Sequence, residues 1–443
     1  CPSTICSVWY VSASHRRRRQ FYLSSASDVS KRQRTTERCI GMGKCRAQSG
    51  AMCPSYQATQ EEKYSTRGRA HLLHEMVRGE VIKDDWDNKD IADSFEHCLS
   101  CKACKTECPT QVDIATYKAE FMAAHYAHKR RPLSHYPLAY IGNLLPKLSR
   151  FSSVVNKLQT GITGQLAQKF LGLSDAKGLP KLAPQSFTGW ARKNANRQDQ
   201  QFHWFGEQDQ PTVVLWADSV NNHYRPTLLQ SAVNVLLKSG HQVAVAKQHF
   251  CCGRPLYEYG FLAQALKQLT LILDGFHSKL PSECSVIVLE PSCLSVFKDE
   301  LLSAFPDDTR ALDLSERAKT LTQFLSDASI TLAKQLNSGI LHLHCHDKSV
   351  SISSHERDWM LRCFKDLQEP ESGCCGMAGT YGLKKQTRAI GQRLFERRLK
   401  PAIDNAANDS VVVANGFSCY EQMMDGQSDR LVLHPVEIIE KCL

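Results

Sequence analysis

The chain has 443 residues, of which 42% are hydrophobic and 23% charged, as in globular proteins of two to four domains. Its formal net charge is +10, but residues 1–38, with eight basic and two acidic side chains, contribute +6 and leave only +4 for the other 405 residues. The body of the protein therefore lacks the basic surface expected of a nucleic-acid-binding protein. No run of 18 apolar residues predicts a membrane-spanning helix.

Nineteen cysteines are a high number, and most of them stand in clusters with short spacings. Because no secretion signal is recognisable, they indicate metal binding in a reducing compartment rather than disulfide bonds. We therefore expect a protein that is located in the cytoplasm or at the inner face of the membrane. Residues 1–36 show no hydrophobic periodicity and are expected to be a disordered arm. Since the chain begins with cysteine, we expect it to be the C-terminal part of a longer protein.

Residues 37–130 contain two groups of cysteines. The second has the spacing C-x2-C-x2-C-x3-C-P, which is typical of ferredoxins that bind a cubane 4Fe-4S cluster. Zinc sites use cysteine pairs that are farther apart. Apolar residues after Ser65 predict one helix, and Asp113 is expected to cap another. We predict a helical ferredoxin-type iron–sulfur domain with these ligands: Cys39, Cys45, Cys53, Cys98, Cys101, Cys104 and Cys108.

The first cysteine group is imperfect, because Met42 stands where the middle ligand of a C-x2-C-x2-C run belongs. In two-cluster ferredoxins the last cysteine of each run binds the other cluster. With that exchange, one cluster receives Cys98, Cys101, Cys104 and Cys53. The other receives only Cys39, Cys45 and Cys108. We therefore predict one stable 4Fe-4S cluster and a second, degenerate site.

Residues 131–210 are expected to form helices followed by a polar linker near residues 193–210. From Thr212 onward, short apolar runs predict strands at 212–216, 241–246, 285–290, 340–344 and 410–414, with a helix at 226–239. Cysteines follow these strands, and Cys-Cys-Gly occurs twice, 123 residues apart. We predict two repeated α/β Cys-Cys-Gly domains at residues 211–330 and 338–443, with cysteines beyond the strand ends, where open α/β sheets place their ligands. The candidate ligands are Cys251, Cys252, Cys293, Cys345, Cys374, Cys375 and Cys419.

The order of these motifs resembles a known family. It includes the glycolate oxidase iron–sulfur subunit, the C subunit of anaerobic glycerol-3-phosphate dehydrogenase and the B subunit of heterodisulfide reductase. The phrases that begin at Arg38, Met52, Cys251, Glu290 and Gly416 are similar to the C-terminal half of FAD- and iron–sulfur-containing D-2-hydroxyacid dehydrogenases, of the D-lactate or D-2-hydroxyglutarate type. The resemblance covers residues 37–443. The Cys-Cys-Gly repeats depart from the family pattern, because Val296 and Gln422 replace the final cysteines and Ala217 or Asp218 stands where the second repeat has Cys345.

The resemblance implies an iron–sulfur electron-transfer module. It would accept electrons from a flavin-containing dehydrogenase domain or subunit and pass them to a quinone or a soluble carrier, with peripheral membrane contact but no membrane-spanning segment. FAD is expected only in the flavin partner. The Cys-Cys-Gly domains are expected to hold a further cluster or zinc, or to leave their cysteines in the core. Two alternatives remain open: a thiol/disulfide redox subunit similar to heterodisulfide reductase, and a zinc-stabilised interaction protein.

Overall fold

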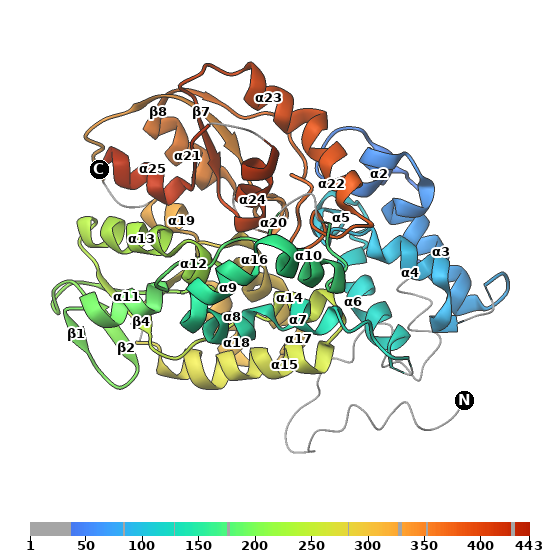
Figure 1. Ribbon diagram of the computed structural model, residues 1–443, viewed down its shortest axis with the longest axis horizontal. Coiled ribbons are helices and arrows are strands. Elements are labelled where there is room, and N and C mark those ends of the chain that lie inside the picture. The colour runs from blue at the N-terminus through green and yellow to red at the C-terminus, as the bar shows by residue number, and fades with distance from the viewer. Residues whose placement is uncertain are drawn as a thin grey trace.

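The computed structural model describes residues 37–443 except 83–84, 128, 175–177, 282, 327–329, 351–352 and 427–429. The arm expected at residues 1–36, which includes Cys1 and Cys6, lies outside the described residues. In Figure 1 the cysteine-rich N-terminal helices occupy the right-hand side, and two sheets with their helices form the rest. Among the described residues, none of the helices has both the length and the apolar character needed to cross a bilayer.

The N-terminal region is built from short helices joined by the cysteine-bearing loops. The side chain of Ser65 accepts a hydrogen bond from the backbone N–H of Gly68 and caps the helix predicted there. Asp113 caps the next predicted helix through the N–H of Thr116. The helices are α2 (Pro54–Thr59), α3 (Thr66–Arg78), α4 (Lys89–Glu96), α5 (Ala103–Glu107) and α6 (Ile114–His125).

A second helical segment follows and leads into the first sheet. Its helices are α7 (His135–Ala139), α8 (Ile141–Leu148), α9 (Ser152–Leu158), α10 (Gly161–Phe170) and α11 (Phe187–Asn194). The polar linker predicted at residues 193–210 is wrong in part. The structure has strands β1 (Arg197–Gln198) and β2 (Phe202–Phe205) there, and β2 pairs antiparallel with β4. All four residues of β2 are buried, but the strand is short and polar residues surround it in the sequence, so the hydrophobic pattern did not predict it.

The first sheet has the order β1-β2-β4-β3-β5-β6, and its last four strands are parallel. These strands are β3 (Thr212–Leu215), β4 (Gln242–Ala246), β5 (Ser285–Ile287) and β6 (Ala318–Lys319). The predicted strands at 212–216 and 285–290 are correctly placed, but the observed β3 and β5 end one and three residues earlier. The strand predicted at 241–246 begins one residue later as β4, and β6 was not predicted. The accompanying helices are α12 (Ser219–Tyr224), α13 (Pro226–Lys238), α14 (Arg254–Glu258), α15 (Leu262–Leu271), α16 (Pro291–Ser295), α17 (Leu301–Ala304), α18 (Thr309–Arg317) and α19 (Leu321–Leu325).

The second sheet is entirely parallel, with the order β10-β9-β7-β8. Both sheets therefore carry the same order of parallel strands, in which the first strand of each lies between the second and the third. The strands are β7 (Leu336–His342), β8 (Phe364–Gln368), β9 (Val411–Ala414) and β10 (Val432–Leu433). The helices are α20 (Cys345–Val350), α21 (Ser353–Cys363), α22 (Arg388–Leu394), α23 (Lys400–Asn405), α24 (Phe417–Gly426) and α25 (Pro435–Cys442).

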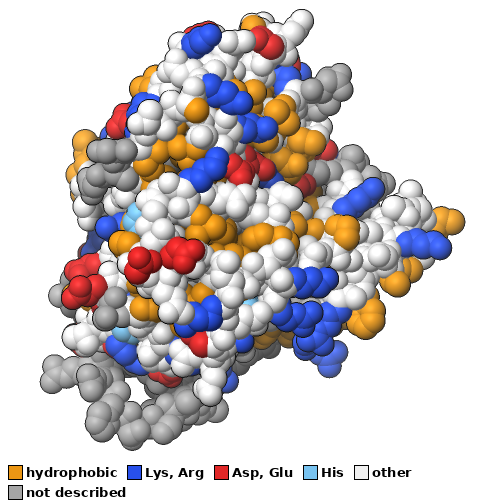
Figure 2. All heavy atoms as spheres, turned by 90° about the vertical axis from the view of Figure 1, so that its left-hand side faces the viewer, with side chains coloured by type: hydrophobic (Ala, Val, Ile, Leu, Met, Phe, Trp, Pro, Cys, Tyr) orange, Lys and Arg blue, Asp and Glu red, His pale blue; other side chains and the backbone are white. Residues whose placement is uncertain are grey.

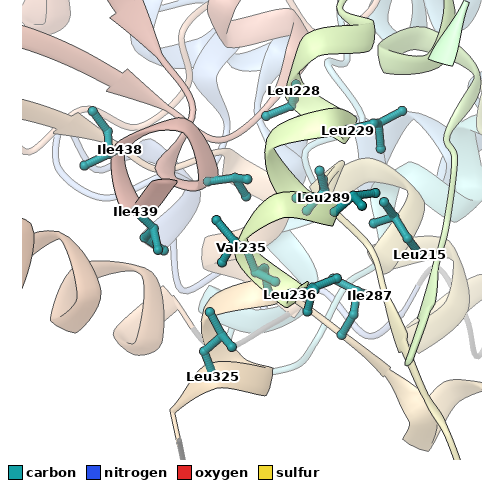
Figure 3. Close-up of a cluster of buried hydrophobic side chains, with 14 of the residues drawn as sticks. Leu215, Leu228, Leu229, Val235, Leu236, Ile287, Leu289, Leu325, Ile438 and Ile439 are labelled. Carbon is teal, nitrogen blue, oxygen red and sulfur yellow. The ribbon is translucent and has the colours of Figure 1, made fainter. Parts of the chain in front are cut away.

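The two sheets share a hydrophobic core between them. Figure 3 shows α13 side chains, Val235 and Leu236 among them, close to Ile438 and Ile439 of α25. These four residues are at most 1% exposed, and burying such side chains contributes about 1.5–3 kcal/mol each. This packing fixes one sheet relative to the other and so sets the positions of the cysteine loops at their strand ends.

Candidate metal centres

Four thiols line one cavity of the N-terminal region: those of Cys53, Cys98, Cys101 and Cys104. The loop before α5 winds tightly because Ser100 and Lys102 adopt left-handed backbone conformations, with φ of 53° and 60°. Burial raises the pKa of the Cys104 thiol to about 12, and it also raises the pKa values of Cys53 and Cys101. As thiolates these groups need a strong positive charge beside them, which iron bound by four thiolates supplies.

Three thiols line a neighbouring cavity: those of Cys39, Cys45 and Cys108, with Met42 on the same wall. The structure thus groups the cysteines as the exchange of last ligands predicts. Cys53, the last cysteine of the first run, lies with the second run, and Cys108, the last of the second run, lies with the first. This cavity lies nearer the surface, since Cys39 and Cys108 are only half-buried and Met42 is 65% exposed.

The start of α3 lies between these two cavities. The backbone N–H of Thr66 donates to the Cys53 sulfur at 2.9 Å, and that of Arg67 donates to the Cys45 sulfur at 3.4 Å. A hydrogen bond from Cys53 lowers the pKa of the Cys45 thiol to about 6. Helix N-termini favour negative charge, so this position suits thiolates bound to iron.

A third group of four thiols lies at the carboxyl ends of the second sheet. Cys345 begins α20 after β7, Cys374 and Cys375 follow β8, and Cys419 lies in α24 after β9. Interaction with Cys374 holds the pKa of the Cys345 thiol well below the ordinary value, and interaction with Cys374 and Cys419 does the same for Cys375. The same interactions raise the pKa values of Cys374 and Cys419.

The Cys-Cys-Gly loop of the second sheet needs glycine at its third position because there is no room for a side chain. Gly376 has φ of 89°, and a Cβ atom there would lie 2.0 Å from the carbonyl oxygen of Gly391. The close approach of loop and helix α22 therefore holds Cys374 and Cys375 against the strand ends. Any larger residue would move the two thiols away from Cys345 and Cys419.

The first sheet carries a smaller group of three thiols, Cys251, Cys252 and Cys293. The sulfur atoms of Cys252 and Cys293 are 3.1 Å apart. Ser219 begins α12 as Cys345 begins α20, so a hydroxyl stands where the other sheet has a thiol. Asp218 comes one residue earlier and caps α12. Asp218 is 1% exposed, and burial raises its pKa to about 7.

The Cys345 group and the Cys98 group lie next to each other in the interior of the protein. His346 of α20 is hydrogen-bonded through Nε2 to the carbonyl oxygen of Ser100 at 2.9 Å, and the Ser349 hydroxyl donates to the carbonyl of Cys101 at 3.1 Å. Cys345 and Cys374 share a buried core with the cysteines of the N-terminal region. The thiol groups therefore form a continuous series from the half-buried Cys39 group, through the Cys98 group, to the Cys345 group.

A buried charge network joins the Cys98 group to the first sheet. Lys102, 1% exposed, lies 2.5 Å from Asp299 and 2.9 Å from Glu300, and Arg254 lies 2.6 Å from Glu300. Although burial opposes it, Lys102 and Lys105 lower the pKa of Asp299 to about 2. Sequence reasoning did not find this network, because the partners are almost 200 residues apart.

Histidines near the Cys345 group were also missed. Residues 342–346 read His-Leu-His-Cys-His, a local density of imidazoles that could have indicated a metal site. The ring of His342 and the thiols of Cys375 and Cys419 offer ligand atoms that all lie within 4.8 Å of one another. Despite burial, Cys345 raises the pKa of the His344 imidazole to about 9. Cys363 and Cys442 lie in the core between the sheets, apart from the ligand groups, and Cys284 lies in the core that also contains Cys252 and Cys293.

Comparisons with known proteins agree with this arrangement. Residues 35–112 match the 4Fe-4S dicluster domain, and residues 218–298 and 363–424 match a cysteine-rich domain. The chain is thus a multi-domain iron–sulfur protein with ferredoxin-type and cysteine-rich domains.

Its relatives are oxidoreductases. It is 24% identical over 441 residues to D-2-hydroxyglutarate dehydrogenase of Pseudomonas putida, covering 90% of the chain and 42% of that relative. It is 26% identical over 407 residues to the C subunit of anaerobic glycerol-3-phosphate dehydrogenase of Escherichia coli, covering 79% of the chain and 99% of the relative. It is 22% identical over 425 residues to the glycolate oxidase iron-sulfur subunit of E. coli, covering 91% and 93%.

The resemblance predicted from the sequence is confirmed by these matches. The matched domains make the chain an iron–sulfur protein whose relatives include dehydrogenases and an oxidase subunit. It spans less than half the length of the D-2-hydroxyglutarate dehydrogenases that it matches.

Proposed function

We propose that this chain carries electrons from the flavin of a D-2-hydroxyacid dehydrogenase, of the D-2-hydroxyglutarate or D-lactate type, to a quinone or a soluble carrier. The observation that carries the proposal is the continuous series of thiol groups. It runs from the half-buried cavity of Cys39, Cys45 and Cys108, past the start of α3, to the buried groups around Cys98 and Cys345. Neighbouring iron–sulfur centres in such a series pass single electrons along the interior.

Each group has a defined part in this proposal. Cys53, Cys98, Cys101 and Cys104 hold a 4Fe-4S cluster in a helical ferredoxin-type domain. Cys39, Cys45 and Cys108 hold a degenerate second cluster that lacks one cysteine ligand. The two Cys-Cys-Gly domains are repeats of one plan, supported by the shared order of their parallel strands, and the second holds a further metal centre. Such centres require thiolates kept reduced, so we place the protein in the cytoplasm.

The chain's own residues would tune and insulate these centres. The N–H groups of Thr66 and Arg67 stabilise negative sulfur between the two N-terminal cavities. Lys102 and Arg69, both buried, bring positive charge to the wall of the Cys98 cavity. Cubane potentials depend on net charge, hydrogen bonds to sulfur and exposure. We therefore expect the exposed Cys39 site and the enclosed Cys98 site to differ in potential.

Anaerobic purification followed by iron and sulfide analysis and EPR tests the proposal. We expect at least one 4Fe-4S cluster per chain, reduced when a flavin-bearing dehydrogenase and its hydroxyacid are added. The chain alone should not oxidise D-lactate, D-2-hydroxyglutarate or glycerol-3-phosphate, because hydride removal needs an organic acceptor. Protein that contains zinc but no iron would refute the electron-transfer role in favour of the zinc-stabilised interaction protein.

One observation favours a second function, thiol/disulfide redox chemistry in the first Cys-Cys-Gly domain. The 3.1 Å between the sulfurs of Cys252 and Cys293 would let the pair form a disulfide. Reduced iron–sulfur centres would supply two electrons, one at a time, and these with two protons would open that disulfide to two thiols. The two thiols would then reduce a disulfide substrate of the heterodisulfide class to its two thiols and return to the disulfide form. Reduction of such a substrate by the reduced chain, lost in Cys252→Ser, would establish this function.

A further inference from the structure

Among the described residues, His342 is the imidazole that faces the Cys375 and Cys419 thiols within ligand distance, and its surroundings are those of a metal ligand. It is the last residue of β7 and is fully buried. Its Nδ1 atom is 2.7 Å from the hydroxyl oxygen of Ser372. The other ring nitrogen, Nε2, has no hydrogen-bond partner in the described part of the chain, although it is buried.

A buried nitrogen without a partner calls for an explanation, because nearly all buried polar atoms are hydrogen-bonded. Metal-ligating histidines characteristically donate their second N–H to an oxygen, which fixes the ring and leaves the other lone pair for the metal. Ser372 takes that role here, with Nδ1–H donating to its hydroxyl. In this tautomer Nε2 carries the lone pair that is free to bind a metal.

The distances fit a shared metal. The His342 nitrogen and the sulfurs of Cys375 and Cys419 all lie within 4.8 Å of one another. Two ligands of one tetrahedral metal ion are about 3.5–3.8 Å apart, given metal–sulfur and metal–nitrogen bonds of about 2.3 and 2.0 Å. A small side-chain rotation therefore suffices for both thiolates and the imidazole to reach one metal atom.

The first Cys-Cys-Gly domain lacks this combination of ligands. Leu215 pairs with Ile287, six residues before Cys293, as Leu341 pairs with Val413, six residues before Cys419. Trp216, which packs with Cys252 and Cys293, therefore occupies the position that His342 holds in the second sheet. At these positions the first Cys-Cys-Gly domain therefore has neither the imidazole nor the fourth thiol. The two domains differ in ligand chemistry at two linked positions, as expected if only the second builds a complete centre.

We infer that the metal centre of the second Cys-Cys-Gly domain is held by Cys345, Cys374, Cys375 and Cys419 together with Nε2 of His342, a nitrogen ligand among thiolates. This inference shares one premise with the proposed function, namely that the Cys345 group binds metal. An imidazole in place of a thiolate makes the site less negative, and such replacement raises the reduction potential of iron–sulfur centres.

Pulsed EPR of the full chain, purified anaerobically and grown with 14N- or 15N-histidine, tests it without any substitution. A directly bound imidazole gives a nitrogen coupling that changes with the isotope, and we expect that coupling to vanish in Cys375→Ser together with part of the bound metal. His342→Gln should also abolish the coupling, whereas His355→Gln, on α21 away from the thiols, should not.

The outcomes separate the two claims. If Cys375→Ser lowers the metal content but no histidine coupling exists in the unmodified protein, His342 is not a ligand and the inference falls, while metal binding stands. If Cys375→Ser leaves the metal content unchanged, the Cys345 group binds no metal and both claims fail. Ser372→Ala, which keeps Nε2, should retain the coupling with an altered strength.

A separate observation concerns the surface of α8–α10. Large apolar side chains project from these helices at a spacing of three or four residues: Leu148, Phe151, Val154, Leu158, Ile162, Leu166 and Phe170. All but Leu148 are more than half exposed, and Ile162 reaches 76%. Monomeric globular proteins rarely expose so many large hydrophobic side chains in one row. We call this row the apolar ridge.

The charged residues in the stretch of sequence that carries the ridge are all basic. Between Glu120 and Asp175 the sequence has no acidic residue, whereas it has seven basic ones: Lys129, Arg130, Arg131, Lys147, Arg150, Lys157 and Lys169. The last four are exposed on the same helices as the ridge. Helices α8–α10 face the viewer in Figure 1, and in Figure 2 that side projects to the right, with hydrophobic and basic side chains and few acidic ones.

A ridge of projecting apolar side chains, with exposed lysine and arginine on the same stretch of chain, fits an anionic lipid surface, where apolar groups insert and basic groups meet phosphates. Helix α8, on which the ridge begins, also contacts a thiol group. A Cβ atom on Gly142 of this helix would lie 2.3 Å from the Cys251 sulfur. We propose that the apolar ridge binds the surface of an anionic membrane and so brings the first Cys-Cys-Gly domain to a lipid-dissolved acceptor.

Co-sedimentation of the full chain with vesicles tests this proposal. Binding to phosphatidylglycerol-containing vesicles should exceed binding to pure phosphatidylcholine and weaken with salt. The double change Ile162→Ser with Leu166→Ser should reduce binding about tenfold or more, since each inserted side chain contributes substantially. A matched control, Leu312→Ser with Leu361→Ser, removes two residues that are each 53% exposed elsewhere and should have no effect.

Absence of binding to either vesicle, or binding that the Ile162 and Leu166 changes leave intact, would overturn it. If those changes instead weaken association with the flavin-bearing partner while vesicles are not bound, the ridge is a protein interface. Electron transfer from a flavoprotein to a water-soluble dye should stay unchanged in the ridge variant, which separates this proposal from the proposed function.

Discussion

Replacing Met42 with cysteine should turn the degenerate second site into a four-iron cluster. Met42 lies on the wall of the cavity that Cys39, Cys45 and Cys108 line. It also takes the middle position of a C-x2-C-x2-C run. A neutral thioether is a poor ligand for iron that is otherwise held by thiolates. Because Met42 is 65% exposed, the change removes little packing and should not unfold the domain.

The magnitude follows from ligand counting. Three thiolates leave one corner of a cubane without a protein ligand, and that corner's iron is the one lost. The substitution supplies the fourth thiolate, so iron content should rise by about one atom per chain if the site otherwise holds three irons, and by more if it is labile. The EPR signal of an oxidised three-iron cluster should disappear and a second signal of a reduced four-iron cluster should appear.

The control is Ile40→Cys, which places a thiol on the same cavity wall at a position of similar exposure, 66%. It should not add iron, because position 40 lies outside the ligand spacing. Two four-iron clusters, each with four cysteine ligands, in the unmodified protein would refute the pairing of the two runs. An equal gain of iron in both variants would refute the role of position 42.

Three further outcomes are expected. Cys375→Ser should lower the bound metal of the full chain, whereas the same change at Cys363, a core cysteine, should leave metal content unchanged. Ser219→Cys should complete a four-thiol set in the first Cys-Cys-Gly domain and add bound iron, measured together with sulfide; no added metal would show that the missing thiol is not what limits that site. Glu300→Gln should destabilise the protein by about 3–5 kcal/mol in urea unfolding, because Lys102 and Arg254 lose a buried partner; a change below about 1 kcal/mol would show that the network is solvated.

Local features of the molecule could be predicted from the sequence because they depend on neighbouring residues. The loop from Cys98 to Cys104 can form only a tight turn with its thiols converging. Asp113 caps α6 because its carboxylate reaches an N–H three residues away. The grouping of Cys53 with the Cys98 run was also predictable, since exchange of last ligands is a property of the spacing. The parallel strands β3, β4, β5, β7 and β9 were predicted because buried strands are apolar throughout, whereas β6, β8 and β10 were not.

Long-range features were decided by the tertiary structure. Strand β2 exists because β4 offers it a partner, although polar residues surround it in the sequence. Lys102 resembles a surface lysine until the first sheet places Asp299 and Glu300 beside it.

The Cys345 group was likewise assembled by the fold. Only the parallel arrangement of β7, β8 and β9 brings the residues that follow three separate strands to one edge, with His342 turned toward them. Spacing along the chain determines which thiols a loop can gather. Packing between the sheets determines which groups lose contact with water, and burial is what gives His342, Asp218 and Lys102 their chemical character.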